Sequence, residues 1–394
     1  MMYCCIVVLL AFHPTIQQYN NTTIYTPSVF LMKKLKLSDN QIIMNKNILT
    51  SLLFCLITTT AFSGNPDRQG EAGAYELLLN PWARSVGLHA MNTASVRGIE
   101  ALSLNVAGLS RIGKTEIGIG HSIYLQGTGL ALNSVGIASR INPNGVLGIS
   151  INALSFGKIP VTTNNLPEGT GGTFAPTFFN LGLSYAHTFD KKVSVGITMR
   201  LINETVADIS AFGFSLDAGV QYTTGTETYP ERFKFGINLR NIGSPMRFGG
   251  QGLNVQGLNP DGTQPYNLTY SNKGAGFELP SQLNIGASYD ILPEDKMRLT
   301  AITNFTSNAF SRDELGAALE FSIGNYFALR GGYKYEVGTS AATLNKSVYT
   351  GVCAGVSVEL PFNKTGSQKL SIDYGYLHTN PWNGTHNIAL RINM

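Results

Sequence analysis

The residues best suited to chemistry in this chain are single charged side chains, set within runs that alternate between apolar and small or polar residues. On a strand such charges share one face, where they can bind an acidic ligand, hold an internal segment, or pair with one another. Pairing is the interpretation we favour, because a buried charge without a partner is costly. The predicted network consists of Arg140, Arg200, Lys234, Arg240, Asp217, Glu320, Arg330, Glu359 and Asp373, with Lys334 and Arg391 in the same pattern.

No motif of an enzyme or a cofactor site accompanies these charges. The sequence has no H-E-x-x-H, no Gly-Lys-Ser phosphate loop and no Gly-x-Ser-x-Gly elbow. Its 6 histidines are scattered, and no two stand at the spacing of metal ligands on one strand face. We therefore expect a non-enzymatic protein with no catalytic residue, no cofactor and no metal.

The composition is unlike that of a soluble domain. Only 13% of the residues are charged, whereas about a quarter are charged in typical soluble domains. Glycine (43 residues), tyrosine (17) and phenylalanine (20) are abundant, as expected for a β-barrel that faces lipid on one side. The net charge of +4 arises mainly before residue 64, so the remainder is nearly neutral and a nucleic-acid partner is not expected.

The first 63 residues have the features of a leader. Residues 44–63 combine a positive start, an apolar centre and a small-residue site, which predict a signal peptide cleaved after Ser63, before Gly64. Residues 1–43 are interpreted as an extension from a start codon assigned too early. A membrane anchor is the rival interpretation, but the apolar run falls short of the ~20 residues that span a bilayer. Removal of the leader leaves Cys353 alone, without a partner for an internal disulfide.

From residue 113 to 394 the chain repeats one pattern, in which about ten residues alternate with period two and a turn follows. In residues 193–201, for example, the apolar side chains all fall on one face of a strand. These side chains are Val193, Val195, Ile197, Met199 and Leu201. Predicted strands begin near residues 115, 129, 145, 175, 193, 212, 233, 280, 297, 313, 325, 348, 368 and 385. The sequence therefore predicts an all-β fold, a transmembrane antiparallel barrel of about 14 strands.

The connections support a barrel, because short and long ones alternate as in bacterial outer-membrane barrels. Residues 142–144 and 190–192 form tight turns, whereas residues 157–173 and 243–279 form long loops. The alternative is a soluble β-sandwich or barrel, in which the polar face of each strand points outward. Aromatic side chains, Trp82 and Trp382 among them, are expected at the two membrane interfaces.

Residues 64–112 lack the strand pattern and are predicted to form a plug. They are expected to hold a short apolar turn or helix, a Gly-rich hairpin, and a strand that enters a tight turn. The segment resembles the start of the PorV/PorQ family, in which an ARxxGMGGA motif precedes an NPAGL motif. Here the motifs correspond to residues 83–91 and 105–109, with His89 and Ala90 at the positions of a Gly pair and Val106 at that of the Pro. The matching residues are Arg84, Gly87, Asn105, Gly108 and Leu109.

Further similarity lies in residues 241–248 and 279–289, which resemble the family strands that flank the longest outer loop. The resemblance spans about residues 70–394 and implies a FadL-like outer-membrane barrel with an N-terminal plug. It further implies that outer loops, residues 244–279 above all, contact the type IX translocon barrel and secreted cargo, with outer-membrane lipid around the barrel wall. The expected function is that of an accessory or cargo shuttle in type IX protein secretion of Bacteroidetes.

Two alternative functions remain open. A FadL-like barrel can instead carry long-chain fatty acids or other hydrophobic small molecules across the outer membrane. An outer-membrane phospholipase or deacylase would need a His, a Ser and a carboxylate aligned on adjacent strands, and the sequence shows no such alignment. Either remaining function places the mature protein in the outer membrane.

Overall fold

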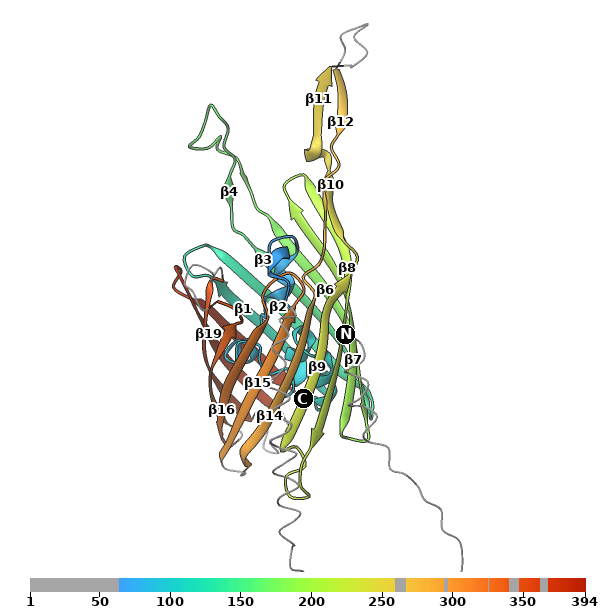
Figure 1. The fold of residues 1–394 in the computed structure, drawn as a ribbon, viewed down its shortest axis with the longest axis vertical. Coiled ribbons are helices and arrows are strands. Elements are labelled where there is room, and N and C mark those ends of the chain that lie inside the picture. Colours follow the sequence, from blue (N-terminus) through green and yellow to red (C-terminus); the bar gives the residue numbers. More distant parts are fainter. Residues whose placement is uncertain (1–63, 259–266, 294–296, 325, 340–346, 362–367) are drawn as a thin grey trace, which may run out of the picture. The chain divides into compact units, whose positions relative to one another are not determined.

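The computed structural model describes residues 64–258, 267–293, 297–324, 326–339, 347–361 and 368–394. Fourteen antiparallel strands, each hydrogen-bonded to two neighbours, close into a ring that forms the barrel wall (Figure 1). The predicted barrel of about 14 strands is therefore confirmed. The wall strands are β1 (Thr115–Tyr124), β2 (Leu130–Asn142), β3 (Gly145–Ser155), β6 (Thr177–Phe189), β7 (Val193–Val206), β8 (Ile209–Thr224), β9 (Phe233–Gly243), β14 (Gln282–Pro293), β15 (Met297–Asn308), β16 (Glu314–Ile323), β17 (Phe327–Glu336), β18 (Tyr349–Pro361), β19 (Lys369–Thr379) and β20 (Thr385–Asn393).

The ring closes between the first and last strands. Strands β1 and β20 pair in register from Glu116 with Asn393 to Ile123 with His386. Every other wall pair joins strands that follow one another around the ring, so the barrel is a meander. Closure leaves no unpaired edge along the ring, which a membrane-spanning sheet requires because lipid cannot satisfy backbone amides.

The two faces of each strand explain why the wall forms in a membrane. In β7 the apolar residues point outward, with Ile197 51% and Met199 47% exposed, whereas Thr198 and Arg200 on the other face are buried. The same inversion occurs around the ring, where isoleucine, leucine and valine make up most of the exposed large apolar residues. The interpretation as a soluble sandwich, with polar residues outward, is therefore wrong. An apolar outer band with a polar interior is the architecture of an outer-membrane barrel.

Short turns gather at one end of the barrel and long loops at the other (Figure 1). The connection from β3 to β6 carries the two-residue strands β4 (Ile159–Pro160) and β5 (Thr173–Phe174). The connection from β9 to β14 first continues the wall, because β10 (Met246–Gly250) pairs with β8, and β13 (Gly276–Phe277) pairs with β10. Beyond them β11 (Asn254–Leu258) and β12 (Asn267–Ser271) form a separate hairpin past the rim.

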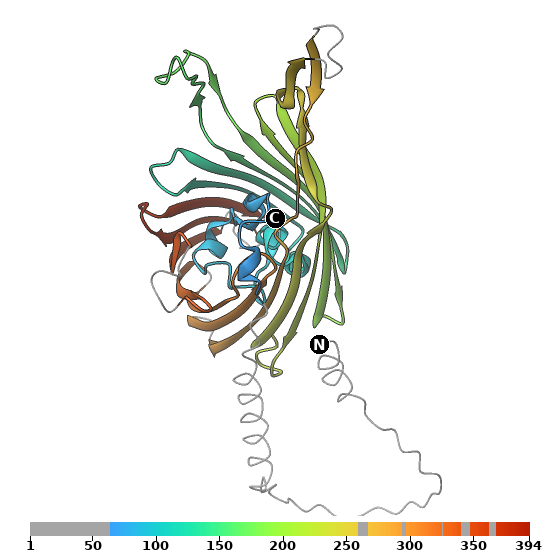
Figure 2. The ribbon, with the colours of Figure 1, turned by 45° about the horizontal axis from the view of Figure 1, so that its top comes forward.

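Residues 64–112 lie within the ring and belong to the same compact unit as the wall (Figure 2). They form short helices, not the expected hairpin and strand, because their apolar residues cluster inward around one core. Trp82, Ile99, Leu102 and Leu109 are fully buried in this core. Trp82 was expected at a membrane interface, and that prediction is wrong. The helices are η2 (Pro66–Arg68), η3 (Tyr75–Leu78), α3 (Ala83–Val86), η4 (Gly98–Ser103) and η5 (Val106–Arg111).

The predicted leader, residues 1–43 and 44–63, lies outside the described residues and stays a prediction. Within the described part of the chain, no helix has the length and apolar character needed to cross a membrane.

Candidate functional site

The candidate site is the interior of the barrel, where the plug meets the wall. Helix α3 contacts β18, β19 and β20, η4 contacts β1 to β3, and η5 contacts β6 to β8. The plug thus touches strands around most of the ring. Inward glycines make this approach possible: a Cβ on Gly355 would lie 2.8 Å from Gly87 Cα, and one on Gly196 would lie 2.8 Å from the Val106 carbonyl carbon.

The residues matched to the NPAGL motif form a turn pressed against the wall. The Asn105 side chain is buried, and its Oδ1 accepts a hydrogen bond from the Ala107 backbone N–H at 3.2 Å, which caps η5. Its Nδ2 donates to the Thr93 carbonyl at 2.9 Å. Gly108 packs on the Val96 carbonyl, and the Leu109 side chain packs on Gly148 of β3. Val106 begins η5, a position that also suits the proline of the motif.

His89 and Ala90 stand at the positions of the glycine pair of the ARxxGMGGA motif, and this difference affects the backbone. Both residues have left-handed backbone conformations, with φ of 49° and 56°. Glycine adopts this region without strain, whereas a side chain costs about 1 kcal/mol or more there. A glycine pair therefore suits this turn for a physical reason, and here two residues with a Cβ carry the strain.

Most of the predicted charged residues pair across adjacent strands. Arg200 contacts Asp217 at 2.8 Å, and Arg330 contacts Glu320 at 2.6 Å. Three further members also form ion pairs across adjacent strands. Asp373 contacts Arg391, which belongs to the predicted pattern, at 2.7 Å. Lys234 contacts Asp290 at 3.2 Å and Glu359 contacts Lys369 at 3.4 Å, and neither of these partners was predicted.

Two predicted members bind the plug backbone. Arg240 Nη2 donates to the Leu77 carbonyl at 2.8 Å. Arg140 donates to the Ser110 and Gly113 carbonyls at 2.8 and 2.9 Å, where the plug leads into β1. Neither residue has an ion pair with a described residue. The interior charges therefore serve two structural purposes, pairing within the wall and holding the plug.

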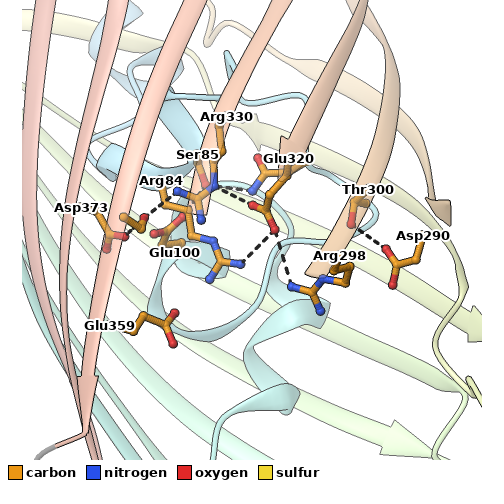
Figure 3. A network of polar contacts seen from close by, with 12 residues as sticks. Arg84, Ser85, Glu100, Asp290, Arg298, Thr300, Glu320, Arg330, Glu359 and Asp373 are labelled. Carbon is orange, nitrogen blue, oxygen red and sulfur yellow. Dashed lines mark hydrogen bonds and ion pairs between the residues drawn. The ribbon is translucent and has the colours of Figure 1, made fainter. Parts of the chain in front are cut away.

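The plug also enters the charge network through side chains (Figure 3). Glu100 of η4 accepts a hydrogen bond from Ser85 Oγ at 2.6 Å and lies 3.6 Å from Arg391 Nε of β20. Arg84 of α3 reaches Glu320 Oε1 at 3.9 Å. Glu320 is thus approached from three directions, by Arg330, by Arg84 and by Arg298.

A cavity of about 200 Å³ lies between the plug and the outer ends of the strands. Its walls are largely apolar and aromatic, with a few hydrogen-bonding groups such as Asn308 and Gln282. The main apolar and aromatic contributors are Tyr75, Leu78, Leu79, Val86, Tyr124, Leu132, Tyr349 and Leu377.

A second cavity of about 130 Å³ adjoins the first beside the end of β17 and the start of β18. Pairing between β17 and β18 ends at Tyr333 and Val352. The last three residues of β17 and the first three residues of β18 are therefore not paired with one another. The cavity is lined by Tyr333 and Tyr335, which face outward, and by His89 of the plug. The cavity is therefore bordered by residues of the plug and by side chains on the outer face of the wall. Both cavities share His89, Glu314, Lys334 and Tyr349.

His89 stands at the junction of the two cavities in its neutral form. Burial, with a contribution from Lys334, lowers the pKa of His89 to about 4. Its ring packs edge-on against Tyr349, with 5.7 Å between ring centroids, and its Nε2 has no hydrogen-bond partner among the described residues. Sequence reasoning missed these cavities, because their residues come from the plug and from nine wall strands.

Near the outer side of the plug, Glu76 of η3 and Glu204 of β7 form a buried carboxyl pair. Burial and the neighbouring Glu204 raise the pKa of Glu76 to about 8. One proton shared by the pair is therefore favoured at neutral pH.

No protein-family model matches the chain, and no curated protein matches it either. Among solved structures, the CymD monoaromatic hydrocarbon channel has 14% identity, with 78% of this chain and 95% of that chain covered and a TM-score of 0.46. The toluene transporter TbuX of Ralstonia pickettii has 12% identity, with 80% and 98% covered and a TM-score of 0.47. A FadL homologue of Pseudomonas aeruginosa has 11% identity, with 78% and 96% covered and a TM-score of 0.45. Membership of the PorV/PorQ family stays a prediction.

Proposed function

We propose that this protein is a non-enzymatic outer-membrane barrel that binds a small hydrophobic molecule and passes it sideways through the wall between β17 and β18. The observation that carries the proposal is the pair of adjoining cavities. The first opens beside the plug, and the second extends between outward-facing Tyr333 and Tyr335. Because the two cavities share lining residues, they support a route from the long-loop end of the lumen to the outer surface of the wall.

The lining of the first cavity indicates the chemical class of the ligand. Aromatic and branched apolar side chains favour a compact apolar body, while Asn308, Gln282 and the hydroxyl of Tyr349 supply a few polar contacts. A volume of about 200 Å³ suits a small aromatic molecule or a short alkyl chain. A long fatty acid would have to extend from the first cavity into the second.

The filled interior argues against a water-filled pore. The plug core around Trp82 packs directly on Ala138, Val146 and Ala389 of the wall. Arg240 and Arg140 hold the plug backbone, and Arg391 joins Glu100 to the wall. Passage straight through the barrel would require breaking these buried contacts, whereas a sideways route leaves them intact.

A binding assay with the fluorescent probe N-phenyl-1-naphthylamine tests the proposal on protein held in amphipol. We expect saturable binding, lost on Leu78→Trp, which fills the first cavity. Thr350→Trp, which narrows the second cavity, is expected to slow uptake of the probe from lipid vesicles. Thr205→Trp lies outside both cavities and is the matched control. Equal binding by Leu78→Trp and wild type would overturn the assignment.

A second candidate function is the accessory role in type IX protein secretion that the family resemblance implies. The observation in its favour is the outer hairpin of β11 and β12, which stands past the rim with exposed Val255, Leu258 and Tyr270. Val255 and Tyr270 lie opposite each other in this hairpin. Exposed apolar side chains on a long outer loop suit a protein partner better than a small ligand.

Pull-down from native outer membranes separates the two functions. Recovery of a translocon barrel or secreted cargo, lost on deletion of β11 and β12, supports the secretion role. If the deletion strain secretes normally and its barrel still binds N-phenyl-1-naphthylamine, the result supports the hydrophobic-molecule function and not the secretion role.

A further inference from the structure

A group of arginines surrounds two small cavities at the short-turn end of the barrel, opposite the cavities described above. The two cavities have volumes of about 30 and 40 Å³ and are both lined by Arg84, Arg97, Arg298 and Glu320. Gly324, in the tight turn between β16 and β17, marks the first of them as lying at the rim. In bacterial barrels the short turns face the periplasm.

Positive charge is in excess around the first cavity, which is lined by four arginines and two glutamates. Both carboxylates are already engaged. Glu320 holds Arg330 at 2.6 Å, and Glu359 holds Lys369 at 3.4 Å. Arg298 and Arg84 reach the same Glu320 only at 3.7 and 3.9 Å. One carboxylate therefore serves three guanidinium groups (Figure 3).

Arg97 is the least compensated of these arginines. It is exposed within the two cavities, and no hydrogen bond or ion pair joins it to another described residue. The positive charge of the nearby Arg84 guanidinium, above all, lowers the pKa of Arg97 to about 10. At neutral pH both groups carry their charge, and Glu320 and Glu359 offset their mutual repulsion only in part.

We propose that Arg97, Arg84 and Arg298 form a binding site for a phosphate-type oxyanion that enters from the periplasmic end. Guanidinium groups bind such oxyanions through paired N–H donors. A tetrahedral oxyanion has enough oxygen atoms to accept hydrogen bonds from three arginines, whereas a single carboxylate has only two oxygen atoms. The anion would supply the negative charge that Glu320 cannot provide to all of them. The site binds through plug and wall together, since Arg84 and Arg97 belong to the plug and Arg298 to β15.

The same chemistry has two sources, inorganic phosphate in the periplasm and the phosphate of a phospholipid headgroup in the inner leaflet. The proposal does not depend on the carrier function, because the site lies at the other end of the lumen.

Isothermal titration of the purified full-length barrel in a neutral detergent with inorganic phosphate tests the site. We expect saturable binding that weakens at least about tenfold in Arg97→Gln, the loss of one charge-assisted hydrogen-bond donor. Arg97→Lys keeps the charge and should retain part of the affinity. Arg247→Gln, an exposed arginine on β10, should bind as wild type does. A barrel check by heat-modifiable migration on gels confirms that each variant is folded.

A second arm uses vesicles with and without phosphatidylglycerol. Saturable phosphate binding that vesicles do not compete away identifies a free anion, whereas stronger, Arg97-dependent binding to phosphatidylglycerol vesicles identifies the headgroup. Failure of wild type to bind either probe at millimolar concentration, or equal binding by Arg97→Gln, would overturn the site.

Discussion

Gly87 of the plug and Gly355 of β18 lie backbone against backbone, so that a Cβ placed on either one would come within 2.8 Å of the other's Cα. Neither glycine has a positive φ, and Gly87 itself is helical at φ −60°. Both positions therefore require glycine for space and not for backbone conformation. This contact fixes how closely α3 can approach the wall.

Gly355→Ala is expected to lower the free energy of unfolding by about 1–3 kcal/mol, because the added methyl overpacks the plug against β18. Urea unfolding in detergent, followed by tryptophan fluorescence of buried Trp82, measures the change. The matched control is Gly249→Ala on β10, where an added Cβ meets nothing within 4 Å. Equal midpoints for the two variants would contradict the close contact.

Ala90→Gly is expected to stabilise the protein by up to about 1 kcal/mol, because φ is 56° at this position and glycine removes the left-handed strain. The same denaturant series measures it. Ala74→Gly, at φ 50° in the same plug, should respond in the same direction. A loss of stability in both variants would mean that chain entropy outweighs strain here.

Glu320→Gln is expected to destabilise the barrel by about 3–5 kcal/mol. The reason is that the buried Arg330 loses its ion-pair partner, and Arg84 and Arg298 lose the same carboxylate. Glu278→Gln breaks an exposed ion pair with Arg68 and should leave the unfolding midpoint unchanged. Similar midpoints for both variants would show that the interior network adds little.

Stability should fall as the pH rises from acid to mildly alkaline values, because of the buried Glu76. Its pKa is about 8 in the folded protein against an ordinary value of 4.5, so the proton binds more tightly to the folded state. This contribution is complete below pH 4.5 and is lost as the pH rises through about 8.

Glu76→Gln should flatten this part of the stability profile, measured as the urea midpoint from pH 5 to pH 9. Exposed Glu71→Gln serves as the control and should keep the wild-type slope. A wild-type profile that rises across this range would contradict the assignment.

The sequence predicted the wall well because period-two alternation has one dominant physical cause. A shift of one residue in strand pairing would turn the apolar side chains inward and the polar ones to lipid, so the pairing register is strongly specified. Ile197, which faces outward, and Thr198, which faces inward, illustrate this on β7. The plug was predicted as a unit but not in its structure. Residues 98–111 form helical turns because Ile99, Leu102 and Leu109 face a curved wall, a packing that no local pattern encodes.

By itself, the sequence determined the strand number, the face that meets lipid, and the inward placement of charges, since each depends on neighbouring residues along a strand. Tertiary structure alone decided which charges meet: Arg200 faces Asp217 across one strand pair, while Arg140 and Arg240 turn to plug carbonyls. It also decided where the interior stays hollow, beside His89 and around Arg97. The physical reason is that cavities and ion pairs arise where distant segments converge, and ring closure with a packed plug sets those distances.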